Sequence, residues 1–143
     1  PILHASRQPG RWLAACIPME TPDWLKITRP PNLRDRLFEF ACVITHLVHD
    51  LHTRGPIPRL LSEQILRAGN SAGANWEEAD DGSSPADKLA KMRITLRELK
   101  ETLFRLRVLR ATGHLAEVHD PIIQENHELK DMVASIVNKL SQK

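Results

Sequence analysis

Four segments of the sequence repeat apolar residues at alternating steps of four and three, the spacing of a single stripe on an α-helix. In the first segment, from about 33 to 53, the stripe consists of Leu33, Leu37, Phe40, Ile44, Leu47 and Leu51. The others run from about 59 to 80, from Pro85 to about 112, and from Pro121 to about 140. Because the connections are short, consecutive helices should be antiparallel neighbours. The pattern predicts an all-α fold, an antiparallel up-down-up-down four-helix bundle that occupies residues 32–143.

Helix-terminus signals separate the four segments. The residues that can cap a helix start are Asn32, Ser84 and Asp120. A proline follows both Ser84 and Asp120 at the first helical position, where its missing N–H costs nothing. The residues that end a helix and form a turn are Gly55, Pro56, Pro58 and Gly113.

Two features interrupt the apolar stripes. The middle of the second segment consists mainly of small residues, namely Ala68, Gly69, Ser71, Ala72, Gly73 and Ala74. Each glycine costs about 1 kcal/mol of helix propensity relative to alanine, so we expect another helix to approach closely there. In the fourth segment Asn126 occupies a stripe position, where we expect it to specify register or oligomeric state at a cost in stability.

Charge, cysteine content and hydropathy limit the class of protein. The formal net charge of +2 is too small to argue for nucleic-acid binding by itself. Cys16 and Cys42 suggest neither a disulfide framework nor a cysteine-based zinc site. No apolar run reaches the roughly 18 residues of a membrane span, and the N-terminus lacks the pattern of an export signal. We therefore expect a cytoplasmic protein that does not enter a membrane.

Residues 1–31 differ from the rest, because six prolines prevent a sustained helix. We predict an extended, Pro-rich N-terminal arm. Its apolar residues Trp12, Leu13, Ile17 and Trp24 are costly to leave in water, so part of the arm should pack on the bundle or on a neighbouring subunit. The alternative interpretation is a translated leader, with Met19 as the true first residue.

A motif in the second segment resembles a known family. Residues 66–79, LRAGNSAGANWEEA, are similar to the central motif of the bacterial four-helix-bundle family named after the 23S ribosomal RNA intervening-sequence protein. The similarity continues through Gly82 and Ser84 and covers about residues 33–140. In the third segment the matching positions are Asp87, Lys91, Met92, Ile94, Glu98, Glu101, Thr102, Leu106, Arg107 and Leu109.

The resemblance implies an antiparallel four-helix bundle without enzymatic activity. Relatives, including the accessory variability determinant of diversity-generating retroelements, form ring-like homopentamers that associate with nucleic acid, so a homopentamer is expected here. Leu103, Phe104 and Arg105 stand where many relatives carry an aromatic pair, and the arm has no counterpart in the family. The resemblance therefore implies neither the detailed packing of the third helix nor a function for the arm.

A polar row on the second segment comprises Arg67, Ser71, Asn75 and Glu78, spaced by four, four and three residues. Two interpretations are open. The row is either a binding or catalytic cleft, or a structural row whose charges pair with the third helix or with another subunit. Because buried polar groups must be paired, we favour the structural row or subunit contact.

The third segment carries the strongest concentration of positive charge. The candidate nucleic-acid-binding residues are Arg93, Arg97, Lys100, Arg105, Arg107 and Arg110. Four of these, at positions 93, 97, 100 and 107, share one edge of a long helix at intervals suited to phosphates. The alternative is a solvated face with pairs inside the helix, such as Arg97 with Glu101. No recognition motif or aromatic stacking platform supports sequence-specific reading of bases.

Metal and catalytic sites have little support in the sequence. His46, His49 and His52 lie near Asp50, but no HExxH or ExxH pattern accompanies them, so we favour an exposed histidine face. The serines and cysteines lack an assignable base, and no glycine-rich loop follows a strand to hold a nucleotide. We expect no catalytic residues, no metal and no cofactor.

Two functional classes fit these features. The first is a non-enzymatic homo-oligomer, pentameric by resemblance, that binds RNA or DNA backbone through the third helix. The second is a protein-interaction adaptor or assembly scaffold, for example for a polymerase or reverse transcriptase, without direct nucleic-acid binding. The basic edge of the third helix favours the first class, whereas the apolar arm and the mild net charge favour the second.

Overall fold

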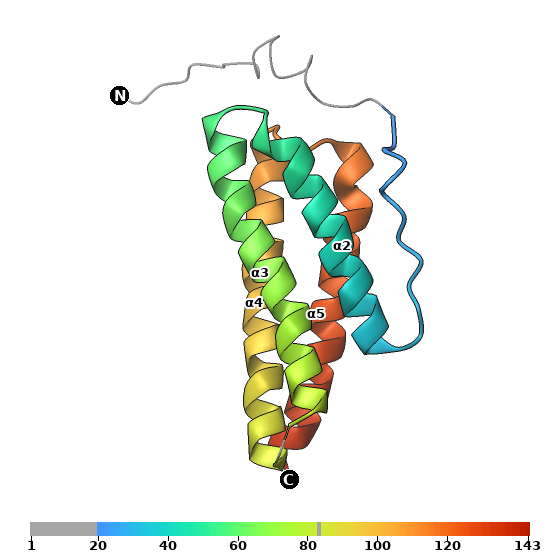
Figure 1. Ribbon diagram of the computed structural model, residues 1–143, viewed down its shortest axis with the longest axis vertical. Helices are drawn as coiled ribbons and strands as arrows, with labels where there is room; N and C mark the ends of the chain where they lie inside the picture. The colour runs from blue at the N-terminus through green and yellow to red at the C-terminus, as the bar shows by residue number, and fades with distance from the viewer. Residues whose placement is uncertain (1–19, 83) are drawn as a thin grey trace, which may run out of the picture.

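The computed structural model describes residues 20–82 and 84–143, which form four long helices in one antiparallel bundle (Figure 1). The elements are α2 (Leu33–His52), α3 (Pro56–Asp80), α4 (Pro85–Ala111), the short 3₁₀ helix η1 (Glu117–His119) and α5 (Asp120–Ser141). Helix α3 packs against α2 and α4, and α5 packs against α4 and α2. The residues that the structure describes form no strand. The predicted all-α up-down-up-down bundle is confirmed.

Two of the three predicted caps are confirmed. Asn32 Oδ1 accepts a hydrogen bond from the backbone N–H of Arg34 at 2.8 Å. Ser84 Oγ accepts one from the backbone N–H of Asp87 at 3.1 Å. After α4, Gly113 adopts a left-handed φ of 80°, which explains why glycine stands there.

The third predicted cap, Asp120, is wrong. Asp120 has helical φ and ψ of −55° and −34° and is the first residue of α5. Because η1 leads directly into α5, His119 occupies the cap position, and its side chain makes no capping hydrogen bond. The Asp120 carboxylate instead accepts a hydrogen bond from Arg110 Nε at 2.8 Å.

Helix α3 begins at Pro56, earlier than the predicted start near residue 59. Gly55 turns the chain with a φ of 108°, a conformation that residues with a Cβ rarely adopt. Pro56 and Pro58 then lie in the first helical turn, where backbone N–H groups have no partner within the helix. These prolines therefore belong to the start of α3 rather than to the turn.

The core is built from the predicted stripes. On α2 the residues at most 2% exposed are Leu37, Phe40, Ile44, Leu47 and Leu51. A Cβ added to Gly69 of α3 would lie 2.9 Å from Cγ2 of Ile44, closer than real Cβ contacts. The close helix approach expected from the small residues is thus the contact of α3 with α2.

Asn126 of α5 is fully buried in the contact with α4. Its Nδ2 donates a hydrogen bond to the backbone oxygen of Leu99 at 2.9 Å. Its Oδ1 is buried and has no hydrogen-bond partner among the described residues. An unpaired buried acceptor costs about 1–3 kcal/mol, which fits the expected cost in stability. Its influence on register or oligomeric state stays a prediction.

Residues 20–32, which we call the strap, run alongside α2 in the opposite direction (Figure 1). Trp24 Nε1 donates a hydrogen bond to Asp50 Oδ2 at 3.1 Å, and its ring stacks on His46. Leu25 joins the hydrophobic core. The expected packing on the bundle is therefore observed for Trp24. The other residues of that prediction, Trp12, Leu13 and Ile17, lie outside the described residues.

A cluster of four charges, two of them largely buried, fastens the strap and α2 to α5. Arg36 Nε lies 2.6 Å from Glu125 Oε1, and its Nη2 lies 2.5 Å from Glu128 Oε2. Arg29 of the strap lies 3.2 Å from Glu125 Oε2. Only 11% of the Arg36 side chain and 3% of the Glu125 side chain are exposed. We call Arg29, Arg36, Glu125 and Glu128 the α2–α5 cluster.

Candidate nucleic-acid interface

Helix α4 carries four exposed cations on one side, Arg93, Arg97, Lys100 and Arg107, which we call the α4 stripe. Steps of four, three and seven residues place them on the same helical face. At 1.5 Å of rise per residue, the stripe is about 21 Å long. The Arg97 side chain is 72% exposed and lies 3.8 Å from the carboxylate of Glu98. The stripe therefore presents its charge to solvent.

The other two predicted nucleic-acid-binding residues are paired with carboxylates. Arg105 Nη2 lies 3.1 Å from Glu101 Oε1, one turn earlier in α4. Arg110 donates to Asp120 at 2.8 Å, and this hydrogen bond raises the pKa of Arg110. The structure thus separates the six candidates into four cations that face solvent and two whose charge is largely neutralised.

Phe104 is an exposed aromatic residue within the α4 stripe that the sequence analysis did not assign to a site. Its side chain is 63% exposed, whereas the preceding Leu103 is 5% exposed. The signal that could have identified it is its position, because Phe104 falls outside the apolar stripe and follows Lys100 by one turn. A large apolar side chain in solvent is a candidate contact residue.

Arg67, the first residue of the polar row of α3, pairs with two glutamates of α4. Arg67 Nη2 lies 2.6 Å from Glu101 Oε1, and its Nη1 lies 3.4 Å from Glu98 Oε2. The hydrogen bond from Arg67 is the main cause of a lowered pKa of Glu101, and Arg105 adds to it. We call Arg67, Arg105, Glu98 and Glu101 the α3–α4 cluster.

The rest of the polar row is also bonded. Asn75 Nδ2 donates hydrogen bonds to the backbone oxygen and to Oγ of Ser71, at 2.9 Å and 3.1 Å. Glu78 accepts one from Lys91 Nζ of α4 at 2.5 Å, which raises the pKa of Lys91. The four side chains of the row therefore have partners within α3 or on α4. Its role as a structural row or a subunit contact stays a prediction.

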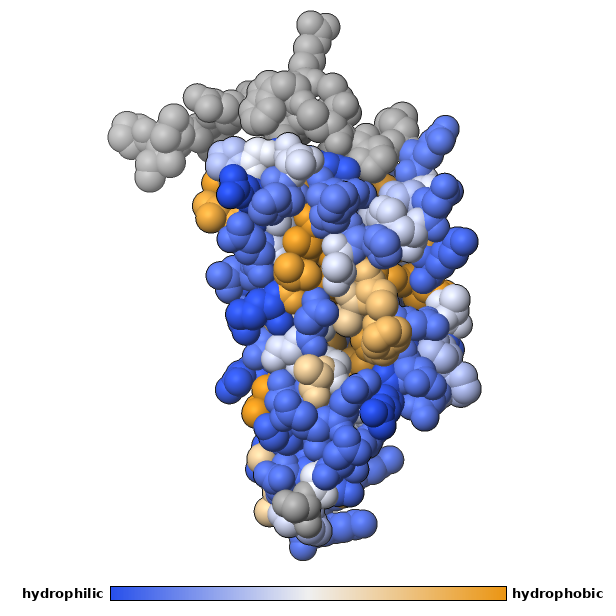
Figure 2. Space-filling model, in the orientation of Figure 1, coloured by the Kyte–Doolittle hydropathy of each residue, from blue (hydrophilic) through white to orange (hydrophobic). Residues whose placement is uncertain are grey.

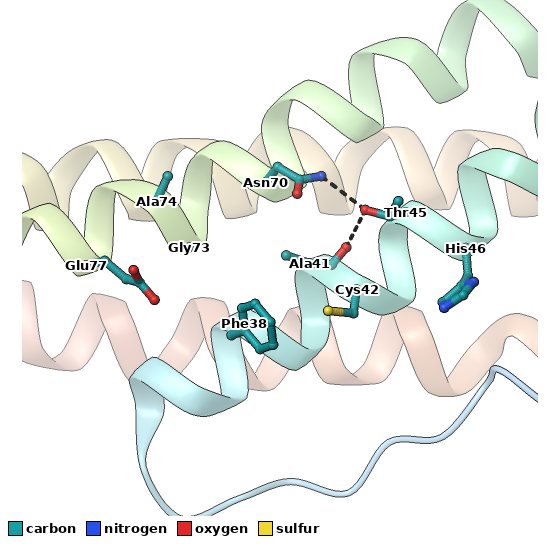
Figure 3. Close-up of a pocket in the computed structure, with 9 residues that line it drawn as sticks. All are labelled: Phe38, Ala41, Cys42, Thr45, His46, Asn70, Gly73, Ala74 and Glu77. Atoms are coloured by element: carbon teal, nitrogen blue, oxygen red, sulfur yellow. Dashed lines mark hydrogen bonds between the residues drawn. The ribbon is translucent and has the colours of Figure 1, made fainter.

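A second surface feature is an apolar groove of about 380 Å³ between α2 and α3. Figure 2 shows apolar side chains gathered in the middle of this face, with polar side chains around them. The groove is lined by Phe38, Ala41, Cys42, Thr45, His46, Asn70, Gly73, Ala74 and Glu77 (Figure 3). Phe38, 62% exposed, lies at its edge. We call this feature the α2–α3 groove.

The histidines do not form a metal site in the described part of the chain. His46 stacks on Trp24, and no group of three His, Cys, Asp or Glu side chains within residues 20–82 and 84–143 is placed to hold a metal ion. His119 is buried, and burial lowers the pKa of its imidazole, whose Nδ1 accepts a hydrogen bond from the backbone of Ala116. Among the described helices, none combines the length and apolar character of a membrane span.

Comparison with known proteins gives two matches. The family model described as 23S rRNA-intervening sequence protein matches residues 35–135. A solved structure from Bacteroides thetaiotaomicron, a protein of unknown function from the S23 ribosomal protein family, is 32% identical with a TM-score of 0.68. That alignment covers 74% of this chain and 98% of the other chain. The comparison with curated proteins finds no match.

Proposed function

We propose that this chain, which belongs to the 23S rRNA-intervening sequence protein family, is a non-enzymatic homo-oligomer that binds the backbone of RNA or DNA through α4. The assembly that we propose is a homopentamer. The observation that carries the proposal is the α4 stripe, four exposed cations along one side of a 27-residue helix. Cations that neutralise phosphates release condensed counterions, so a polyanion binds without any reading of its sequence.

Self-assembly would strengthen such binding. In a symmetric ring every copy contributes one stripe, so several weak phosphate contacts act together. We place the contact between copies at the α2–α3 groove, where Phe38 is exposed and where Gly73 and Ala74 let a second helix approach closely. A large apolar side chain beside an apolar groove gains free energy when a second copy covers it.

A filter-binding titration with labelled RNA or DNA tests the nucleic-acid proposal. Four phosphate contacts predict that affinity falls by roughly 50- to 150-fold between about 50 and 200 mM salt. Changing Arg93, Arg97 and Lys100 together to Glu should abolish binding. The matched control changes Lys26, Arg59 and Lys139 to Glu, because these exposed cations lie off α4 and the change in net charge is identical. Equal binding by the two variants would exclude the α4 stripe as the site.

Light scattering tests the assembly. We expect a solution mass of five subunits for the wild type and a lower mass for Phe38→Asp, which places a charge at the α2–α3 groove. A wild-type pentamer that Phe38→Asp leaves intact would exclude the groove as the contact between copies. A monomeric wild type would exclude the homo-oligomer itself.

The second candidate function is a protein-interaction adaptor, and the α2–α3 groove is the observation that favours it. In that case the groove receives a helix or loop of another protein rather than a second copy. A wild type that ignores nucleic acid at low salt, but forms a complex of fixed stoichiometry with a defined protein, would support the adaptor. Loss of that complex in Phe38→Asp would locate it at the groove.

A further inference from the structure

Phe104 is held in solvent between two cations. At 63% exposure it has the highest exposed fraction of any large apolar side chain that the structure describes. Lys100 precedes it by four residues and Arg107 follows it by three, so all three share one face of α4. Leu103 and Leu106, on either side in sequence, are buried at 5% and 0% exposure and fix the helix in the core. The ring therefore cannot turn inward without breaking the packing of α4.

Beginning about one turn beyond Phe104, the surface is hollowed between α4 and α5. A shallow depression there is lined by Arg107, Arg110, Ala111, Asp120, Ile123 and His127. Arg107 thus belongs both to the α4 stripe and to this depression. Guanidinium and imidazole groups beside an apolar side chain suit a flat polar group, since both can stack on it and donate hydrogen bonds to it.

An exposed ring among cations suits a single strand of nucleic acid better than a duplex. In a duplex the bases stack on one another, so a ring reaches a base face only if two neighbouring bases are unstacked, which costs free energy. In a single strand the bases are free, and proteins bind such strands with a positively charged track that carries aromatic side chains. The α4 stripe, with Phe104 between Lys100 and Arg107, has both components.

We propose that Phe104 stacks on an unpaired base, so that the ligand of the α4 stripe is a single-stranded segment of RNA or DNA. The inference rests on the nucleic-acid binding proposed above and specifies its ligand class. Lys100 and Arg107 lie about 6 Å and about 4.5 Å from Phe104 along the helix axis. They contact the phosphates on either side of the stacked nucleotide. The length of the stripe, about 21 Å, accommodates a few nucleotides, near the lower end of the site sizes known for single-strand binders.

Fluorescence anisotropy with two probes tests the inference. The probes are a labelled 12-nucleotide single strand of mixed sequence, made as RNA and as DNA, and a blunt duplex of the same length. The change Phe104→Leu keeps an apolar side chain but removes the aromatic face. We expect it to lower single-strand affinity by roughly 5- to 100-fold and to leave duplex affinity within about twofold. Phe104→Trp should restore single-strand binding, because a larger ring still stacks.

Ile57→Ala is the control, because Ile57 is another exposed apolar residue but lies at the N-terminal end of α3, off α4 and outside the lining of the α2–α3 groove. It should leave both affinities unchanged, and light scattering should give the wild-type mass for all three variants. If Phe104→Leu binds both probes as the wild type does, or loses both equally, base stacking is excluded while backbone binding survives. A lower mass for Phe104→Leu alone would assign Phe104 to a subunit contact instead. If the wild type binds neither probe, the failure lies in the proposed function itself.

Discussion

Two clusters of two arginines and two glutamates tie neighbouring helices together, and they differ mainly in the burial of the arginine that reaches both glutamates. In the α2–α5 cluster, Arg36 reaches Glu125 and Glu128, which lie three residues apart on α5. In the α3–α4 cluster, Arg67 reaches Glu98 and Glu101 of α4 with the same spacing. The Arg36 side chain is 11% exposed, whereas the Arg67 side chain is 52% exposed.

The two clusters have the same geometry, but the difference in burial of Arg36 and Arg67 should give them different roles. A buried pair is costly to break, because removal of one partner leaves an uncompensated charge away from water. An exposed pair contributes little, because water and salt screen it. We therefore expect the α2–α5 cluster to control the stability of the bundle, and the α3–α4 cluster to adjust the charge beside the α4 stripe.

The largest expected effect is that of Arg36→Ala. Glu125 would stay buried, lose its bidentate partner and keep only the half-exposed Arg29 at 3.2 Å, so we expect the free energy of unfolding to fall by about 3 kcal/mol, the lower end for a broken buried pair. Urea denaturation followed by circular dichroism measures this change. A loss below about 1 kcal/mol would show that burial does not distinguish the two clusters.

The double variant Arg36→Met with Glu125→Leu sharpens this comparison. It removes both buried charges and fills their space with apolar groups, so most of the stability lost in Arg36→Ala should return. The same denaturation experiment measures the recovery. A double variant as unstable as Arg36→Ala would assign the loss to packing of the arginine stem rather than to the buried carboxylate that Arg36→Ala leaves behind.

Acid should weaken both clusters. The hydrogen bond from Arg36 is the main cause of a lowered pKa of Glu128, with contributions from Gln124 and Arg29, and Arg67 lowers the pKa of Glu101. A carboxylate with a lowered pKa in the folded state binds fewer protons there than in the unfolded state. Its stabilisation is therefore complete above the ordinary glutamate pKa and is lost as the pH falls through the lowered value. Melting temperatures between about pH 7 and pH 3 should fall for the wild type, and less steeply for Arg36→Ala and for Arg67→Ala.

The smallest expected effect on stability is that of Arg67→Ala. Because Arg67 is half exposed, its removal should reduce the free energy of unfolding by at most about a third of the loss in Arg36→Ala. Thermal melting in about 1 M sodium chloride, where the screening length is only about 3 Å, should erase the difference from the wild type. A loss that survives in high salt would indicate that Arg67 stabilises the helices through packing.

Local features of the sequence were sufficient to predict most of the fold. The stripe of α2 and the caps at Asn32 and Ser84 depend on residues within one or two turns of each other, and the structure confirms them. The cap at Asp120 failed because η1 continues into α5, which the proline at 121 does not reveal. The α2–α5 cluster could not be predicted, since Arg36 and Glu125 lie 89 residues apart and Glu125 is off the apolar stripe.

For the candidate interface, too, the sequence was sufficient for features set by helical spacing, but not for contacts between distant residues. Helical spacing alone placed Arg93, Arg97, Lys100 and Arg107 on one face. Arg105 follows Glu101 by four residues, so its pair within the helix could have been recognised from the sequence. The partner of Arg110 is Asp120, which the turn between α4 and α5 brings back to α4, and no local pattern indicates that contact.

The opposite directions of the strap and α2 give the N-terminal region a defined mechanical behaviour. Tension applied at Glu20 and directed away from α2, at right angles to its axis, would load the strap contacts one after another, as in peeling, rather than all at once, as in shear. The contact of Trp24 with Asp50 would open first, then that of Thr28 with Glu39, and last the anchor of Arg29 at the buried Glu125. Little work would reach the four helices before the last contact gives way. A pull in this direction should therefore detach the strap at low force while the bundle stays folded.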